Sequence, residues 1–61
     1  MEKTRYFVDF YEGTRIEISH ELLVGDTAHC TVDGETVEGE VRLRWYDADT
    51  NRFVFEVEDL R

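Results

Sequence analysis

The sequence predicts an all-β fold, a single small five-stranded antiparallel barrel or strongly bent sheet that spans residues 1–61 as one domain. Two observations lead to this prediction. Apolar and β-branched residues alternate with polar ones over five runs, which is the pattern of half-buried strands. Segments with the composition of tight turns separate several of these runs at hairpin spacing. We therefore expect two hairpin units, with at most one short helical turn near residues 19–23.

The first hairpin is expected over residues 4–19. Residues 4–10 are rich in aromatic and β-branched side chains, and residues 11–13 form a three-residue loop whose glycine supplies a positive φ. This loop length keeps the apolar residues of both strands in phase. The expected pairs are Phe10 with Thr14, Val8 with Ile16, and Tyr6 with Ile18.

Residues 19–26 connect the two hairpin units. Ser19 is a suitable cap for one helical turn, and glycine and aspartate at 25–26 end the segment. We expect Leu22, Leu23 and Val24 to plug one open end of the barrel. The alternative is that they form an exposed contact for a partner.

A three-stranded meander over residues 27–58 contains most of the predicted order. Asp33-Gly34 is a two-residue loop of the kind that a type I′ hairpin needs. It fixes the register of the strands on either side. The expected pairs are Val32 with Glu35, Cys30 with Val37, His29 with Glu38, Ala28 with Gly39, and Thr27 with Glu40.

The third strand of the meander returns along residues 52–58. If Trp45 pairs with Phe53, the apolar residues of both strands share the buried face. The same register makes two favourable cross-strand pairs, Arg42 with Glu56 and Tyr46 with Arg52. The residues expected on the buried side are Val41, Leu43, Trp45, Phe53, Phe55 and Val57.

The chain is strongly acidic, because 15 Asp and Glu residues outnumber 7 Lys and Arg residues and leave a formal net charge of −8. Such a surface repels phosphate groups, so we expect binding neither to nucleic acid nor to an anionic membrane. Only one of the basic residues is a lysine. Two interpretations remain open, a protein from a halophilic organism and an ordinary acidic protein.

A chain of 61 residues buries a small core, and its single cysteine cannot form an intrachain disulfide. Homodimerisation through a sheet edge or an apolar face is therefore a reasonable hypothesis. No apolar run approaches the ~20 residues of a membrane-spanning helix. The first five residues lack the apolar core of a signal peptide, so we expect a cytoplasmic protein.

The sequence indicates no enzyme, cofactor or metal site. His29 and Cys30 are neighbours on a strand and point to opposite faces, which separates the possible base from the possible nucleophile. Asp47, Asp49 and Asn51 alternate as calcium ligands do, but the helices of a calcium-binding hand are missing. We expect these three residues to form a turn.

The remaining candidate site is a positive surface on the last hairpin, formed by Arg42, Arg44, Tyr46 and Arg52. These side chains are expected to project from one side of the sheet. Arginine forks beside an aromatic ring suit a phosphate, a carboxylate or an acidic loop of another protein. The alternative is that they only pair across strands with Glu56 and its acidic neighbours.

The runs 23–27, 33–34, 37–41 and 52–60 resemble the later strands of PilZ domains, and Tudor-type and other SH3-like barrels share this rhythm. PilZ domains bind a cyclic dinucleotide through an arginine motif and an Asp-x-Ser-x-x-Gly turn. Residues 9–13 lack the serine and are one residue short, so no ligand residue carries over. Two functions remain open: a non-enzymatic protein interaction module, and a degenerate PilZ-type barrel that holds a phosphate-bearing ligand through Arg42, Arg44 and Arg52.

If the acidic surface is an adaptation to salt, screening of carboxylate repulsion stabilises the folded state. The melting temperature should then rise steeply between dilute buffer and molar salt, as measured by circular dichroism. An unchanged melting temperature over this range would contradict the halophilic interpretation.

Overall fold

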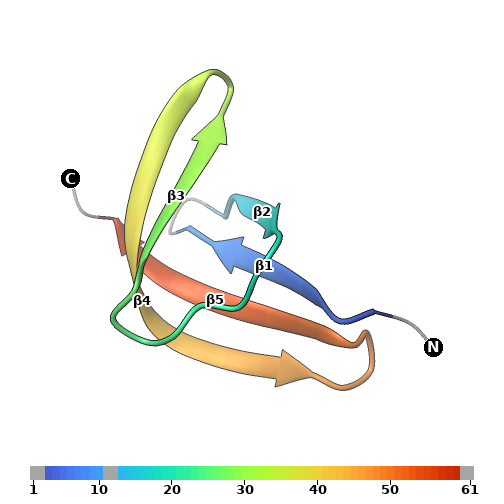
Figure 1. The fold of residues 1–61 in the computed structure, drawn as a ribbon. Coiled ribbons are helices and arrows are strands. Elements are labelled where there is room, and N and C mark those ends of the chain that lie inside the picture. The colour runs from blue at the N-terminus through green and yellow to red at the C-terminus, as the bar shows by residue number, and fades with distance from the viewer. Residues whose placement is uncertain (1–2, 11–12, 60–61) are drawn as a thin grey trace.

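A computed structural model of the chain describes residues 3–10 and 13–59, and the described residues form one sheet without a helix. The strand order is β2-β1-β5-β4-β3, and the sheet curves until it is nearly closed into a barrel (Figure 1). The all-β prediction is therefore confirmed, and residues 19–23 have no helical turn. The strands are β1 (Arg5–Asp9), β2 (Arg15–Ile18), β3 (Thr27–Val32), β4 (Glu35–Asp47) and β5 (Arg52–Asp59).

The first hairpin has the predicted register. Val8 pairs with Ile16, and the Phe10 amide donates to the carbonyl oxygen of Thr14 at 2.9 Å. Gly13 has a φ of 76°, as the predicted loop requires. The two residues before this glycine, 11 and 12, lie outside the described part of the chain.

The hairpin of β3 and β4 also has the predicted register at each of its pairs. Asp33 and Gly34 have φ values of 52° and 82°, which are the two positive values of a type I′ turn. Val32 therefore faces Glu35 and all later pairs follow. This hairpin rises away from the rest of the sheet in Figure 1.

The two hairpin units are joined by a parallel pairing between β1 and β5, in which Tyr6 lies beside Phe53 and Val8 beside Phe55. The predicted sheet was antiparallel throughout, and this one pairing makes it mixed. A two-residue loop forces antiparallel strands, but β1 and β5 are far apart in the sequence. Their relative direction is therefore set by how the hairpin units pack and not by a local turn.

A β-bulge in β4 alters the predicted pairing with β5. Val41 pairs with Val57 as expected, but the next pair is Leu43 with Glu56. Arg42 is thus an extra residue in β4, and the predicted pair of Arg42 with Glu56 does not form.

All side chains of β4 after the bulge face the side opposite to the predicted one. Tyr46, and not Trp45, pairs with Phe53, so the predicted pair of Tyr46 with Arg52 is also wrong. Leu43 and Trp45 were expected to be buried, yet 52% and 38% of their surfaces are exposed. The physical reason is the period of two along a strand, because one inserted residue exchanges the two faces.

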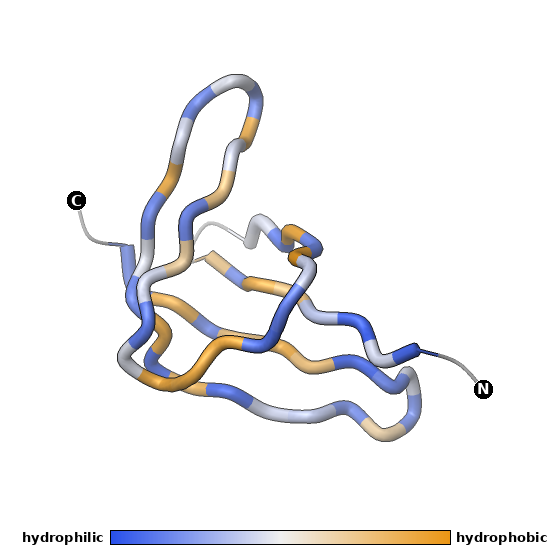
Figure 2. The backbone as a smooth tube through the Cα atoms, in the orientation of Figure 1, coloured by the Kyte–Doolittle hydropathy of each residue, from blue (hydrophilic) through white to orange (hydrophobic). Residues whose placement is uncertain are grey.

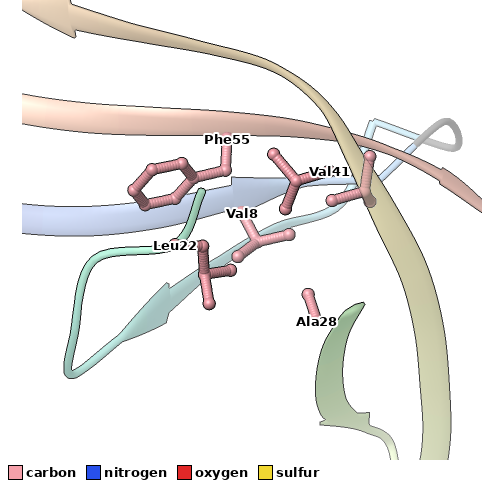
Figure 3. Close-up of a cluster of buried hydrophobic side chains, with 6 residues drawn as sticks. Val8, Leu22, Ala28, Val41 and Phe55 are labelled. Atoms are coloured by element: carbon pink, nitrogen blue, oxygen red, sulfur yellow. The ribbon is translucent and has the colours of Figure 1, made fainter. Parts of the chain in front are cut away.

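The core lies inside the curve of the sheet, where the apolar stretches of β1 and β5 run side by side (Figure 2). Val8, Val41 and Phe55 are completely buried and come from three different strands (Figure 3). Leu22 adds to them from the connecting segment, and only 7% of its surface is exposed. The predicted plug is confirmed for Leu22 and wrong for the next two residues, Leu23 and Val24, which are exposed.

Gly39 lies against β5 at a place that has no room for a side chain. A Cβ atom at Gly39 would lie 2.7 Å from Cγ2 of Val57 and 3.1 Å from the backbone oxygen of Glu58. Gly39→Ala should therefore lower the free energy of unfolding by about 1–3 kcal/mol in urea denaturation.

Gly34→Asn is the matched control for this substitution. Gly34 has a positive φ and open space around it, and asparagine tolerates this φ. The control should change the free energy of unfolding by less than about 1 kcal/mol. Equal losses in both variants would contradict a steric role for Gly39.

Candidate interaction surfaces

The predicted positive surface is divided between the two faces of the sheet. The guanidinium carbon of Arg44 lies 5.1 Å from the ring centre of Phe53, and that of Arg52 lies 5.1 Å from the ring centre of Phe7. Phe53 pairs with Tyr6, the neighbour of Phe7 in β1. Successive residues of a strand point to opposite faces, so Arg44 lies on the inner face and Arg52 on the outer face.

Arg42 and Tyr46 have partners of their own. Arg42 lies 2.9 Å from a carboxylate oxygen of Glu58 and 3.8 Å from one of Glu40. The hydroxyl group of Tyr46 donates to the side-chain oxygen of Asn51 at 2.6 Å. The alternative of cross-strand pairing thus describes Arg42 correctly, but its acidic partners are Glu40 and Glu58.

Arg44 fastens the connecting segment to the open side of the barrel. It donates to the backbone oxygen of Leu22 at 3.2 Å and forms an ion pair with Glu21. Its guanidinium group also stacks over the rings of Phe53 and Phe55. Arg44 therefore occupies a place on the inner face where the sequence predicted an apolar side chain, and it holds Leu22 in the core. Because Arg44 and Arg52 lie on opposite faces, they cannot act as one fork on one phosphate.

The outer face of the sheet carries an apolar band, which we name the outer stripe. Phe7, Val54 and Trp45 lie side by side on β1, β5 and β4, and Leu43 follows on β4. Val54 is only 1% exposed, because its neighbours cover it. The indole nitrogen of Trp45 donates to Glu56 at 2.8 Å, which fixes the ring at the surface.

A shallow hollow of about 590 Å³ adjoins the outer stripe at Leu43. Its rim carries charges of both signs, including an Arg15 side chain that donates to the carboxylate of Asp9 at 2.6 Å and 2.9 Å. The outer stripe and this hollow together offer apolar contact area within a polar rim, as protein interfaces do. The lining residues are Asp9, Phe10, Gly13, Arg15, Arg42, Leu43, Glu56 and Val57.

Cys30 and His29 lie on opposite faces of β3, as predicted. Cys30 is 7% exposed, and burial raises the pKa of its thiol. The exposed ring of His29 has its Nδ1 atom 3.8 Å from a carboxylate oxygen of Glu38. Within residues 3–10 and 13–59, no three side chains of the metal-binding types come together.

The turn between β4 and β5 has the role that the sequence predicted for its alternating polar residues. A carboxylate oxygen of Asp47 accepts the backbone amide of Asp49 at 3.0 Å, and Asn51 takes a φ of 54°. The side-chain oxygen of Asn51 also accepts the hydroxyl of Thr4 at 3.1 Å. These side chains thus form the turn and join it to the start of β1.

No protein-family model matches the chain, and no curated protein or solved structure matches it either. In the part of the chain that the structure describes, there is no helix with the length and apolarity needed to cross a membrane.

Sequence reasoning missed the outer stripe because the bulge at Arg42 leaves no clear signal in the sequence. A run with apolar residues at 41, 43 and 45 predicts one uninterrupted strand face. The only hint is Arg44, which lies between Leu43 and Trp45. An arginine has a long apolar stem, so it can cover aromatic rings on the inner face as well as face water.

Arg44→Gln should release the connecting segment, because glutamine cannot replace both the ring stacking and the bond to Leu22. We expect a loss of about 1–2 kcal/mol in the free energy of unfolding. Hydrogen exchange should become faster at the amides of Gly25 and Asp26, which donate to the backbone oxygens of Val41 and Leu23.

Arg42→Gln is the matched control, because the side chain of Arg42 is 56% exposed and binds only surface carboxylates. It should cost less than about 1 kcal/mol and leave the exchange rates of the connecting segment unchanged. If both variants behave alike, Arg44 does not have the fastening role.

Proposed function

We propose that this small acidic β-barrel protein is a non-enzymatic interaction module that binds another protein through the outer stripe. The observation that supports the proposal is the bulge at Arg42, which turns Leu43 and Trp45 out of the barrel. β-bulges that redirect side chains are frequent next to functional sites.

Exposure of these two side chains has an energetic cost in a chain with so small a core. Fully burying a large apolar side chain contributes about 1.5–3 kcal/mol, and the barrel gives up part of this contribution at Leu43 and Trp45, which are 52% and 38% exposed. A tryptophan held in one orientation, here by Glu56, is the residue type most often central to a protein interface. Contact with a partner recovers the burial that the fold does not provide.

The charge of the chain indicates the kind of partner. A net charge of −8 repels acidic proteins and nucleic acids and attracts basic surfaces. Glu56 and Asp9 lie at the rim of the hollow beside Leu43, where Arg15 and Arg42 also lie, so the attraction of a basic partner comes from the net charge of the whole chain. We therefore propose a protein partner that places an apolar side chain on the outer stripe and basic residues around it. In a halophilic organism, high salt would weaken this attraction and leave the apolar contact dominant.

The test is affinity capture from the native lysate, with the wild-type chain compared with Leu43→Ser/Trp45→Ser. The double variant should lose the captured partner and keep the far-ultraviolet circular dichroism of the folded sheet. Its melting temperature should fall somewhat, because Trp45 covers part of Val54 and donates to Glu56. Trp45 is the single tryptophan of the chain, so its fluorescence also reports binding directly. The emission should shift to shorter wavelength when the purified partner covers the ring.

Leu23→Ser/Val24→Ser is the matched control, because these side chains are 60% and 59% exposed and lie in the connecting segment. It removes two exposed apolar side chains outside the outer stripe and should leave capture unchanged. The proposal fails if the two double variants capture the partner equally well.

A further inference from the structure

β3 is an edge strand with no charged side chain of the Asp, Glu, Lys or Arg type. Its sequence is TAHCTV, and each of the other four described strands carries at least two such charges. Edge strands that remain monomeric are usually protected by charges, proline or a bulge. The residues of β3 follow the plain register of its hairpin without a bulge.

The geometry of the hairpin shows which backbone groups point away from β4. A two-residue loop makes Val32 and Glu35 a hydrogen-bonded pair, and such pairs recur at Cys30 and Ala28. The amide and carbonyl groups of Thr27, His29 and Thr31 therefore point toward the outer edge. Within the described ranges, no strand pairs with β3 on that side.

The other open edges of the sheet carry charges. β2 has Arg15 and Glu17 on its four residues, and Glu17 accepts two bonds of 2.8 Å from Arg5, which lower its pKa. The end of β4 beyond its described contact with β5 has Glu35 and Glu38. β3 is thus the exception in a chain that places charges along its other exposed edges.

The half of β3 that ends at Val32 is also accessible. The β3 and β4 hairpin stands clear of the strands β1 and β5 in Figure 1, so another strand can approach its edge. The hollow of about 160 Å³ beside β3 is lined by Thr27, Ala28, His29 and Cys30 and, from β2 and the connecting segment, by Ile18, His20 and Leu22, whereas Thr31 and Val32 lie outside it. We therefore consider pairing along residues 29–32.

Charge identifies the occupant of this edge. Two chains that each carry −8 repel wherever their carboxylates face each other, and the edge of β3 brings none of them together. A basic peptide has no such advantage, because β3 offers it no carboxylate. Thr31 at the edge pairs well with its own copy when the strand is reversed, because two threonines can hydrogen-bond across neighbouring strands.

We propose that β3 pairs with β3 of a second copy in a symmetric antiparallel dimer that joins the two sheets edge to edge. The outward backbone groups at 29 and 31 allow a twofold axis at position 29, 30 or 31. The dimer is closed, because the pairing uses both β3 edges and the β2 edges at its ends are charged. It leaves the outer stripes of both chains accessible and is independent of the function proposed above.

The test is sedimentation equilibrium of the purified chain over a range of protein and salt concentrations. The wild-type chain should form a dimer, and its dissociation constant should fall as salt rises, because salt screens the repulsion between the two chains. A wild-type chain that stays monomeric up to millimolar concentration in molar salt would overturn the proposal.

Thr31→Glu and Thr36→Glu form a matched pair of variants, because these exposed threonines face each other across the hairpin. Glutamate at 31 adds one negative charge to the edge of each chain, so two like charges meet at the contact in a dimer. The dissociation constant of the dimer should therefore rise by about tenfold or more. Glutamate at 36 lies on β4, one strand away from the contact between the two β3 edges, and should change the dissociation constant by less than about threefold. Equal effects would place the contact elsewhere.

Disulfide trapping gives a measurement that does not depend on added charge. Three chains each test one position of the twofold axis. They are the wild-type chain with Cys30 and the variants His29→Cys and Thr31→Cys, both of which also carry Cys30→Ser. Cross-strand cysteines can bond when their Cα atoms are within about 7 Å. One of the three should form a covalent dimer on mild oxidation, and Thr36→Cys with Cys30→Ser should not. If none of the three does, or only the control does, the proposal is wrong.

Discussion

The bulge at Arg42 is the constraint on which the rest of the structure depends. It divides β4 into residues 35–41, which pair with β3 and with the end of β5, and residues 43–47, which pair with the rest of β5. The alternation of side chains between the two faces is reversed from one part to the other. Val41 can therefore lie in the core while Leu43, two residues later, faces outward. Without the extra residue, Leu43 and Trp45 would face the interior and Arg44 would face outward.

Arg44 shows how the inner face adjusts to this change of register. Its guanidinium group covers Phe53 and Phe55, whose rings stack in parallel with centres 6.1 Å apart. An arginine can close the open side of a barrel because its stem is apolar and its charged group still reaches a carboxylate, here Glu21. The connecting segment thus needs no helix to keep Leu22 buried.

The two proposed surfaces follow from the same limitation, which is the small core of a chain of 61 residues. The outer stripe leaves Trp45 and Leu43 exposed, and the edge of β3 leaves backbone hydrogen-bonding groups without a described partner. Both are places where the acidic chain has few charges, so both can approach another surface. Contact at the outer stripe buries apolar side chains, and pairing at the edge of β3 forms backbone hydrogen bonds.

Local chemistry by itself determined the strands and both hairpin registers, because Asp33-Gly34 and the loop ending at Gly13 each fix a pairing within a few residues. The absence of formal charge from β3 can also be read directly from the sequence. Only the tertiary structure decided the parallel contact of β1 with β5 and the bulge at Arg42, since both depend on how distant strands pack. One inserted residue reverses a face, so the positions of the predicted arginines and of Trp45 could not follow from the alternation alone.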